Sequence, residues 1–302
     1  MSSSIRTRVR LLALLVVVAS FAAVPAAHAA GQFPVPKDNY VALGDSLAFG
    51  YQGNTVGACA PTNCATPDTL FRTGYVDDFA TAMRAVGGNP TSVVNFGCPG
   101  ETSSTLLNAT NGTTGCTTYN NPYTGGQPFP IHRPHPGTTQ IDAAVAYISA
   151  HASQVNPITL DIGANDLLGL ISGCANDPVC IGAAAPATIG VVAQNTAIAL
   201  GKLRAAAPRA KIIVLGLYNP AFTLPGGDYL TNSVFNPTIA NVAAQFGASF
   251  ANPFQTINHG AAYPNEAASV CSQINICAAG DVHPFDNGYQ AIADVIFGVS
   301  GF

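Results

Sequence analysis

The stretch "VALGDSLAFGYQ", residues 41–52, carries an apolar segment into Gly-Asp-Ser and then returns to apolar sequence. The run 39–45 predicts a buried strand, and the residues after it predict a short helical turn. Such a turn presents the Ser46 hydroxyl at the end of a strand, close to a helix N-terminus whose N–H groups stabilise negative charge. By itself the stretch fits two roles for Ser46, a helix-capping residue and a nucleophile.

The rest of the chain alternates short apolar runs with Ala-rich segments. The runs predict strands at 92–97, 157–163, 210–217 and 248–254, and the segments predict helices at 74–87, 139–153, 187–207, 231–247 and 286–298, the last capped by Asp286. Short, continuously apolar strands are typical of a sheet buried on both faces. The alternation therefore predicts an α/β fold with a central parallel sheet, in one domain over residues 31–302. The aperiodic segment 107–137 predicts an extended loop beside the binding cleft.

Composition restricts the class of protein. Of the 302 residues 48% are hydrophobic and only 9% are charged, which is enough apolar material for a substantial core. The formal net charge is -4, and no cluster of basic residues follows Arg10. Nucleic-acid binding needs such a cluster, so we expect no nucleic-acid partner.

The N-terminus has the pattern of a secretory signal peptide over residues 1–30. Arg6, Arg8 and Arg10 precede the apolar run "LLALLVVVASFAAV", and small residues in "AAHAAG" provide a cleavage site after Ala29 or Ala30. The alternative is an uncleaved membrane anchor, which the shortness of the apolar run disfavours. Because no comparable apolar stretch follows, we expect a secreted, soluble protein without stable membrane insertion.

The eight cysteines agree with an oxidising destination. They form four pairs of near neighbours, each around a loop-like stretch, and we expect four local disulfides, although sequence alone does not prove the pairing. The expected pairs are Cys59–Cys64, Cys98–Cys116, Cys174–Cys180 and Cys271–Cys277. A zinc site is the alternative, and it is disfavoured because no CxxC or paired His/Cys spacing is present.

Three more polar motifs follow the first. "NFGCPGETSS" (95–104) places Gly97 and Gly100 around a Cys-Pro turn, and "DIGANDLLG" (161–169) offers the Asn165 amide after a strand. Near the C-terminus, "AGDVHPFDNGYQ" (279–290) holds His283 beside Asp281. A serine hydroxyl is a poor nucleophile until a base takes its proton, and a third group must orient that base.

These four motifs, in this order, resemble those of the GDSL hydrolases of the SGNH superfamily, over almost the whole mature chain. The export signal and local cysteine pairs are similar to those of secreted actinobacterial members. The resemblance implies a flavodoxin-like three-layer α/β/α sandwich and ester hydrolysis. The sequence offers no support for a metal or nucleotide cofactor, and we expect none. The resemblance also implies that Ser46 is the nucleophile and His283 the base. The oxyanion hole would comprise the Ser46 N–H, Gly100, which matches better than Gly97, and Asn165.

The C-terminal motif departs from the family pattern by one residue. The usual aspartate lies three residues before the histidine, where this chain has Gly280, while Asp281 lies only two before it. Either Asp281 orients the imidazole through a shifted turn, or a backbone carbonyl near Ala279 or Gly280 does so. We predict a Ser46–His283–Asp281 triad.

We therefore expect a secreted serine esterase or lipase, monomeric, that cleaves small-molecule or lipid esters through an acyl-enzyme. A carbohydrate O-acetylesterase with the same site is the alternative. A catalytically silent extracellular binding protein is a third reading, disfavoured because Ser46, Asn165 and His283 are all present. Leu47, Phe49, Tyr51 and "LLGLI" (167–171) would line an apolar cleft or belong to the core.

Overall fold

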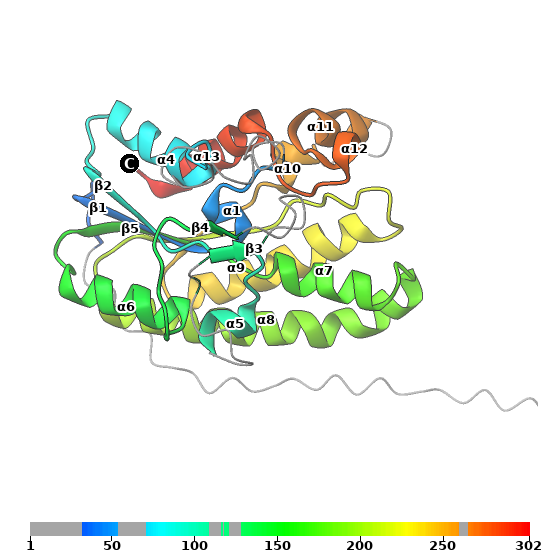
Figure 1. The fold of residues 1–302 in the computed structure, drawn as a ribbon, viewed down its shortest axis with the longest axis horizontal. Helices are drawn as coiled ribbons and strands as arrows, with labels where there is room; N and C mark the ends of the chain where they lie inside the picture. Colours follow the sequence, from blue (N-terminus) through cyan, green and yellow to red (C-terminus); the bar gives the residue numbers. More distant parts are fainter. Residues whose placement is uncertain (1–31, 54–70, 109–115, 117, 121–127, 260–264) are drawn as a thin grey trace, which may run out of the picture.

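Five parallel strands form a single sheet in the order β2-β1-β5-β6-β7 (Figure 1). The computed structural model describes residues 32–53, 71–108, 116, 118–120, 128–259 and 265–302. The strands are β1 (Asn39–Gly44), β2 (Ser92–Asn95), β5 (Val155–Asp161), β6 (Ile212–Leu215) and β7 (Ser249–Ala251). Every residue of β1, β5 and β6 is buried, as the continuous apolar runs require.

Alternate side chains of each strand enter two separate cores. Val41 and Leu43 belong to one apolar cluster, and Tyr40 and Ala42 belong to the other. In Figure 1, α4 and α13 lie above the sheet, and α6, α8 and α9 lie below it. The predicted α/β sandwich with a central parallel sheet is therefore confirmed.

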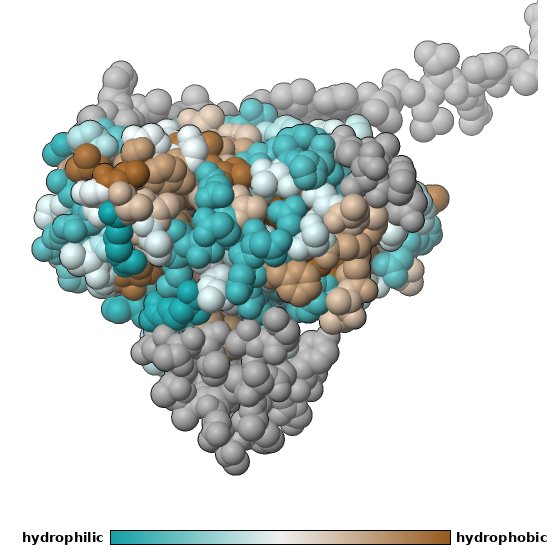
Figure 2. Space-filling model, turned by 90° about the horizontal axis from the view of Figure 1, so that it is seen from above, coloured by the Kyte–Doolittle hydropathy of each residue, from teal (hydrophilic) through white to brown (hydrophobic). Residues whose placement is uncertain are grey.

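Helices of very different length surround the sheet. They are α1 (Ser46–Phe49), α4 (Tyr75–Ala85), α5 (Ser103–Leu107), α6 (Gln140–Ala150), α7 (Ala164–Gly173), α8 (Pro178–Ala206), the π-helix η2 (Tyr229–Phe235), α9 (Asn236–Gln245), α10 (Phe254–Ile257), α11 (Asn265–Gln273), α12 (Ile276–Ala279) and α13 (Asp286–Ser300). Seen from above, the upper face presents hydrophobic residues in small groups among hydrophilic ones (Figure 2).

Helix α8 begins nine residues before the predicted start at residue 187. The Asp177 carboxylate accepts the Val179 N–H at 3.0 Å, Pro178 occupies the first turn, and the helix continues through Pro186. Its length and composition would allow it to span a membrane, contrary to the expectation that no such stretch follows the N-terminus. Its inner side nevertheless packs in the lower core, as is typical of a helix covering a sheet.

Three other predictions need correction. The segment 107–137 is not wholly loop, because β3 (Thr118–Asn120) and β4 (Pro128–Pro130) form an antiparallel ladder within it. The helix predicted at 231–247 begins earlier, as η2, before continuing into α9. Asp286 does not cap α13; Phe285 is the N-cap, and Asp286 is the first helical residue, where its carboxylate accepts from Gln52.

Three of the four expected disulfides are present, Cys98–Cys116, Cys174–Cys180 and Cys271–Cys277. The first joins the loop after β2 to the segment that leads to β3. The fourth expected pair, Cys59–Cys64, and the expected signal peptide lie outside the described residues.

Gly44, the last residue of β1, permits an unusually close approach of two strands. Its φ is +148°, and a Cβ at this position would lie 2.0 Å from Asp161 Oδ1. The Gln140 side chain extends the end of the strand, since it accepts from the Gly44 N–H at 2.7 Å and donates to the Gly44 carbonyl at 2.9 Å. The position therefore has room for glycine alone.

We expect Gly44→Ala to lower the free energy of unfolding by roughly 2–4 kcal/mol, because it combines backbone strain with overpacking. Gly87→Ala is the matched control, since Gly87 also has a positive φ, +79°, but a Cβ there would meet nothing within 4 Å. Chemical denaturation of both variants measures the difference. Equal losses would contradict the assigned close contact.

Candidate active site

Ser46 lies at the carboxyl end of β1, as the first residue of α1. The Asp45 carboxylate accepts the Leu47 N–H at 2.9 Å, so Asp45, and not Ser46, caps this helix. The capping role left open for Ser46 is therefore filled by its neighbour. Ser46 is 9% exposed and lines a cavity, which leaves its hydroxyl accessible at the end of the sheet.

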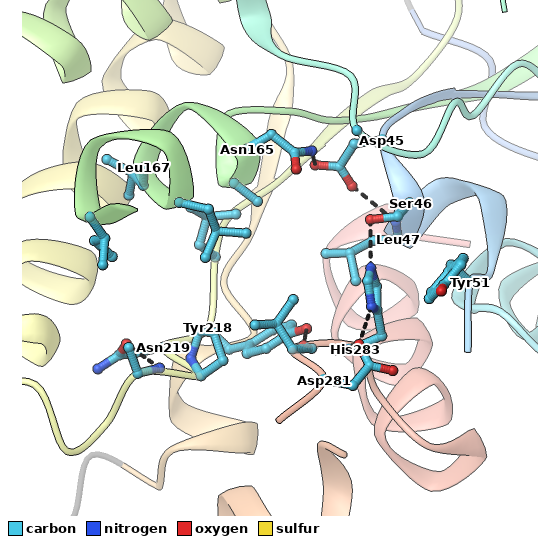
Figure 3. A pocket seen from close by; sticks show the side chains of 18 of the residues that line it. Asp45, Ser46, Leu47, Tyr51, Asn165, Leu167, Tyr218, Asn219, Asp281 and His283 are labelled. Carbon is cyan, nitrogen blue, oxygen red and sulfur yellow. Dashed lines mark hydrogen bonds and ion pairs between the residues drawn. The ribbon is translucent and has the colours of Figure 1, made fainter. Parts of the chain in front are cut away.

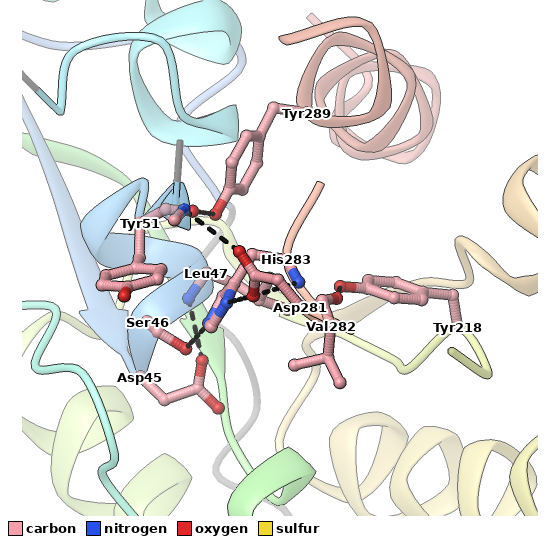
Figure 4. A network of polar contacts seen from close by, with 10 residues as sticks. Asp45, Ser46, Leu47, Tyr51, Tyr218, Asp281, Val282, His283 and Tyr289 are labelled. Atoms are coloured by element: carbon pink, nitrogen blue, oxygen red, sulfur yellow. Dashed lines mark hydrogen bonds and ion pairs between the residues drawn. The ribbon is translucent and has the colours of Figure 1, made fainter. Parts of the chain in front are cut away.

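The C-terminal loop brings His283 to this hydroxyl. His283 Nε2 lies 2.8 Å from Ser46 Oγ, although the two residues are 237 positions apart, and His283 Nδ1 contacts Asp281 Oδ1 (Figure 4). The three residues thus form one continuous chain of hydrogen bonds, with the imidazole in the middle.

A local turn explains how Asp281 reaches the imidazole with one residue fewer than usual. Gly280, with φ +68°, ends α12 in the left-handed conformation. The next residue, Asp281, then bends back. Its Oδ1 accepts the backbone N–H of His283 at 3.1 Å and also the Nδ1–H of the His283 ring. No backbone carbonyl hydrogen-bonds to Nδ1 in the part of the chain that the structure describes.

Neighbouring groups keep Asp281 ionised and in place. Burial alone would raise the pKa of its carboxyl, but hydrogen bonds from His283 and from the Gly53 N–H, the latter at 3.1 Å, outweigh burial and lower the pKa. On the other side of the loop, the Tyr218 hydroxyl donates to the Val282 carbonyl at 2.6 Å. These contacts fix both ends of the short turn.

Tyr51 supports the imidazole itself. Its ring centroid lies 4.4 Å from that of His283, and its carbonyl accepts the Tyr289 hydroxyl at 2.7 Å. Figure 4 shows Tyr51 and Tyr289 on one side of His283 and Asp281, and Tyr218 on the other. The His283 ring, near the C-terminal end of the chain, thus packs against the ring of Tyr51, near the N-terminal end.

The cavity beside Ser46 also receives Gly100 and Asn165. Gly100 has φ +83°, and neither its N–H nor that of Ser46 has a hydrogen-bond partner among the described residues. Gly97 is positioned differently: a Cβ there would lie 2.5 Å from the Phe49 nitrogen, so it serves close packing against α1. Of the two candidate glycines, only Gly100 faces the cavity.

The Asn165 amide is held by two hydrogen bonds. Its Nδ2 donates to the Glu101 carbonyl at 2.9 Å and to Asp45 Oδ2 at 3.2 Å. Its neighbour Asp166, whose role the sequence did not reveal, accepts the backbone N–H and the hydroxyl of Ser103, each at 2.8 Å. Together these bonds fix the start of α7 against the Gly100 loop and the start of α5.

Buried carboxyl groups lie beneath Ser46. Burial and the proximity of Asp161 raise the pKa of Asp45 well above its usual value. Burial raises the pKa of Asp161 to about 6, although Asp161 accepts the Tyr75 hydroxyl at 2.6 Å. The sequence analysis assigned no role to Asp161. The signal that could have indicated one is a carboxylate at the end of an otherwise apolar strand.

The cavity has a volume of about 300 Å³ and lies between α7 and the loop that follows β6 (Figure 3). Its lining is largely apolar and includes Leu47, Tyr51, Leu167, Leu168, Ile171 and Leu217. The sequence left open whether Leu47, Tyr51 and residues 167–171 line a cleft or belong to the core. Most of them line the cleft. Phe49 belongs to the core instead, because it is fully buried and packs on Phe71 at 4.8 Å between ring centroids.

Within the described ranges, no group of three or more His, Cys, Asp or Glu side chains is placed to hold a metal ion. The cavity is lined by the serine, the histidine and hydrogen-bond donors. This arrangement is suited to nucleophilic attack on an electrophilic carbonyl and to stabilisation of the resulting oxyanion.

Solved structures with the same fold include several ester hydrolases. Phospholipase A1 from Streptomyces albidoflavus NA297 superposes with a TM-score of 0.54 at 17% identity, over 87% of this chain and 99% of that chain. An extracellular lipase from Streptomyces rimosus gives 0.52 at 17%, over 86% and 99%. A catalytic mutant of an acetylxylan esterase from Geobacillus stearothermophilus gives 0.55 at 13%, over 89% and 96%. At these identities the similarity shows a common fold.

The sequence matches none of the curated proteins with which it was compared. A family profile, in contrast, matches residues 42–291, a span that begins within β1 and ends within α13. That span contains Ser46, Gly100, Asn165, Asp281 and His283. The chain belongs to the GDSL-like lipase/acylhydrolase family, a family of ester hydrolases.

Proposed function

We propose that this protein is a serine carboxylic ester hydrolase that acts through an acyl-enzyme. The observation that carries the proposal is the 2.8 Å contact between Ser46 Oγ and His283 Nε2 in a cavity that also holds Gly100 and Asn165. A hydroxyl at hydrogen-bond distance from an oriented imidazole is the arrangement that activates serine.

In the first half of the reaction, Ser46 Oγ attacks the ester carbonyl carbon and its proton passes to His283 Nε2. The tetrahedral oxyanion then collapses, the bond to the alcohol oxygen breaks, and His283 returns the proton to the departing alcohol. In the second half, His283 takes a proton from water, the hydroxide attacks the acyl-enzyme, and the proton returns to Ser46 as the acid leaves. The turnover consumes one water and needs no cofactor.

Asp281 has an orienting role in this scheme. An ionised carboxylate on Nδ1 holds the tautomer in which Nε2 is free to accept the serine proton, and it stabilises the imidazolium that forms. The lowered pKa of the Asp281 carboxyl keeps it ionised at neutral pH.

The oxyanion hole comprises the N–H groups of Ser46 and Gly100 and the Asn165 amide. The two N–H groups have no protein partner among the described residues, so they bind the oxyanion without losing an existing bond. The Asn165 amide already makes two bonds, and the oxyanion replaces the longer one, at 3.2 Å to Asp45.

The apolar cavity favours an acyl group longer than acetyl. Leu167, Leu168 and Ile171 on α7 face Tyr218 and Leu217 across it, and such walls bind methylene groups, which acetyl lacks. We therefore place esterase or lipase activity ahead of carbohydrate O-acetylesterase activity for this site.

We also propose that the protein is exported and that its signal peptide is cleaved near Ala30. Three disulfides among the described residues support an oxidising destination. The arginine-rich, apolar N-terminal sequence supports recognition by an export system.

We expect Ser46→Ala and His283→Ala each to reduce kcat on p-nitrophenyl octanoate by about 10⁴–10⁶, because each removes a member of one catalytic unit. The double variant should be no slower than the slower single variant. Steady-state kinetics on all three variants measure this, with thermal unfolding to verify the fold. Additive losses, or a single variant with normal turnover, would refute the proposed pair.

We expect Asp281→Asn to reduce kcat by up to about 10⁴, since the neutral amide favours the wrong tautomer of His283. Asp177→Asn is the matched control, because Asp177 makes a similar turn but caps α8 at the surface. The control should retain normal turnover. A loss of less than tenfold for Asp281→Asn would reduce the site to a Ser–His dyad.

A further inference from the structure

A threonine with a hydroxyl that the catalytic scheme does not use lines the cavity. Thr231, on the π-helix η2, lines the cavity and is only 6% exposed. Its Oγ1 makes no hydrogen bond to any residue that the structure describes, and unlike Thr196 Oγ1 it is not fully enclosed by the protein. The hydroxyl is therefore available to a molecule in the cavity.

The other polar groups around the cavity are already occupied. Apart from Asp45, the proposed catalytic groups and the two tyrosines, the polar side chains of the lining are Asn219 and Thr231. Asn219 accepts the Ala221 N–H at 3.0 Å and donates to Asp228 at 2.8 Å. Thr231 thus differs from its polar neighbour in having no side-chain partner among the described residues.

Three helical threonines elsewhere in this chain satisfy their hydroxyls locally. Thr81, Thr188 and Thr238 each donate to the backbone carbonyl four residues earlier, at 2.7–3.4 Å. Thr231 makes no such bond. Thr196 on α8 also lacks a partner, but it is fully buried and does not line the cavity.

The segment that carries Thr231 is anchored on both sides. Asp228, just before η2, accepts from Asn219, and Asn236, just after it, exchanges two hydrogen bonds of 2.8 Å with the backbone of Leu217. A π-helix is a rare element that occurs frequently at functional sites. The anchors hold the Thr231 side chain against a fixed wall, which is how a specificity-determining group is normally supported.

We propose that the Thr231 hydroxyl recognises an oxygen atom carried by the acyl chain of the substrate, so that the preferred substrates are esters of keto- or hydroxy-substituted acids. This inference rests on the proposed ester hydrolysis at Ser46. The surrounding apolar walls bind the methylene groups, and Thr231 hydrogen-bonds the chain oxygen, acting as donor to a ketone and as donor or acceptor to a hydroxyl.

The test compares ethyl octanoate with its oxo derivatives that carry a ketone at carbon 4, 5, 6 or 7, measured by acid release. In the wild-type protein, at least one of these keto esters should exceed octanoate in kcat/KM by about two- to tenfold, the usual effect of one hydrogen bond. Thr231→Val, which removes only the hydroxyl function, should abolish that preference. Thr231→Ser, which keeps the hydroxyl, should retain it.

Thr196→Val is the matched control, because it removes an unpartnered threonine hydroxyl that lies outside the cavity. The ketone preference should be unchanged. Identical ratios of keto-ester to octanoate hydrolysis in the wild type and Thr231→Val would overturn the inference, as expected of a hydroxyl that only binds water. Hydrolysis of octanoate with no ketone preference in the wild type would also overturn it, while leaving the proposed function intact. Absence of hydrolysis of every ester would instead refute the proposed function.

Discussion

The hydrogen bond between Ser46 Oγ and His283 Nε2 joins the first strand of the sheet to the last loop of the chain. It forms only if β1 lies inside the sheet, between β2 and β5, and α13 packs above it, so that the preceding loop reaches the strand end. The order β2-β1-β5-β6-β7 provides the first condition. The upper core, where Tyr289 packs with residues of β1 and α4, provides the second.

The two carboxyl groups beneath Ser46 are buried at an energetic cost to the folded state. Asp45 and Asp161 are buried side by side, and burial makes their ionisation unfavourable. The Asp45 carboxyl, however, caps α1 and accepts a hydrogen bond from the Asn165 amide. One carboxyl therefore positions both the turn that carries Ser46 and the Asn165 side chain. Asp161 in turn lies where Gly44 brings two strands together. Positioning of this kind is what a preorganised oxyanion hole requires.

Much of this arrangement was accessible from the sequence because each site residue directly follows a regular element or lies in a short turn. Apolar runs predicted the five strands, and strand ends placed Ser46, Gly100 and Asn165 together. Bonds between distant segments were not accessible. Nothing local in Gln140, Asp166 or Tyr218 indicates its partner, and the same holds for the Asn219–Asp228 contact just before η2. The spacing of Asp281 and His283 left the turn undecided, since only the left-handed Gly280 shows how the carboxylate reaches the ring.

Covalent labelling by a fluorophosphonate is the most direct test of the central claim that Ser46 is an activated nucleophile. Such a reagent captures only a serine whose proton is removed by a neighbouring base. Intact-mass analysis should show one adduct per chain, peptide mapping should place it on Ser46, and Ser46→Ala should remain unlabelled. An adduct on another residue, or equal labelling of Ser46→Ala, in a preparation that hydrolyses esters would contradict the account.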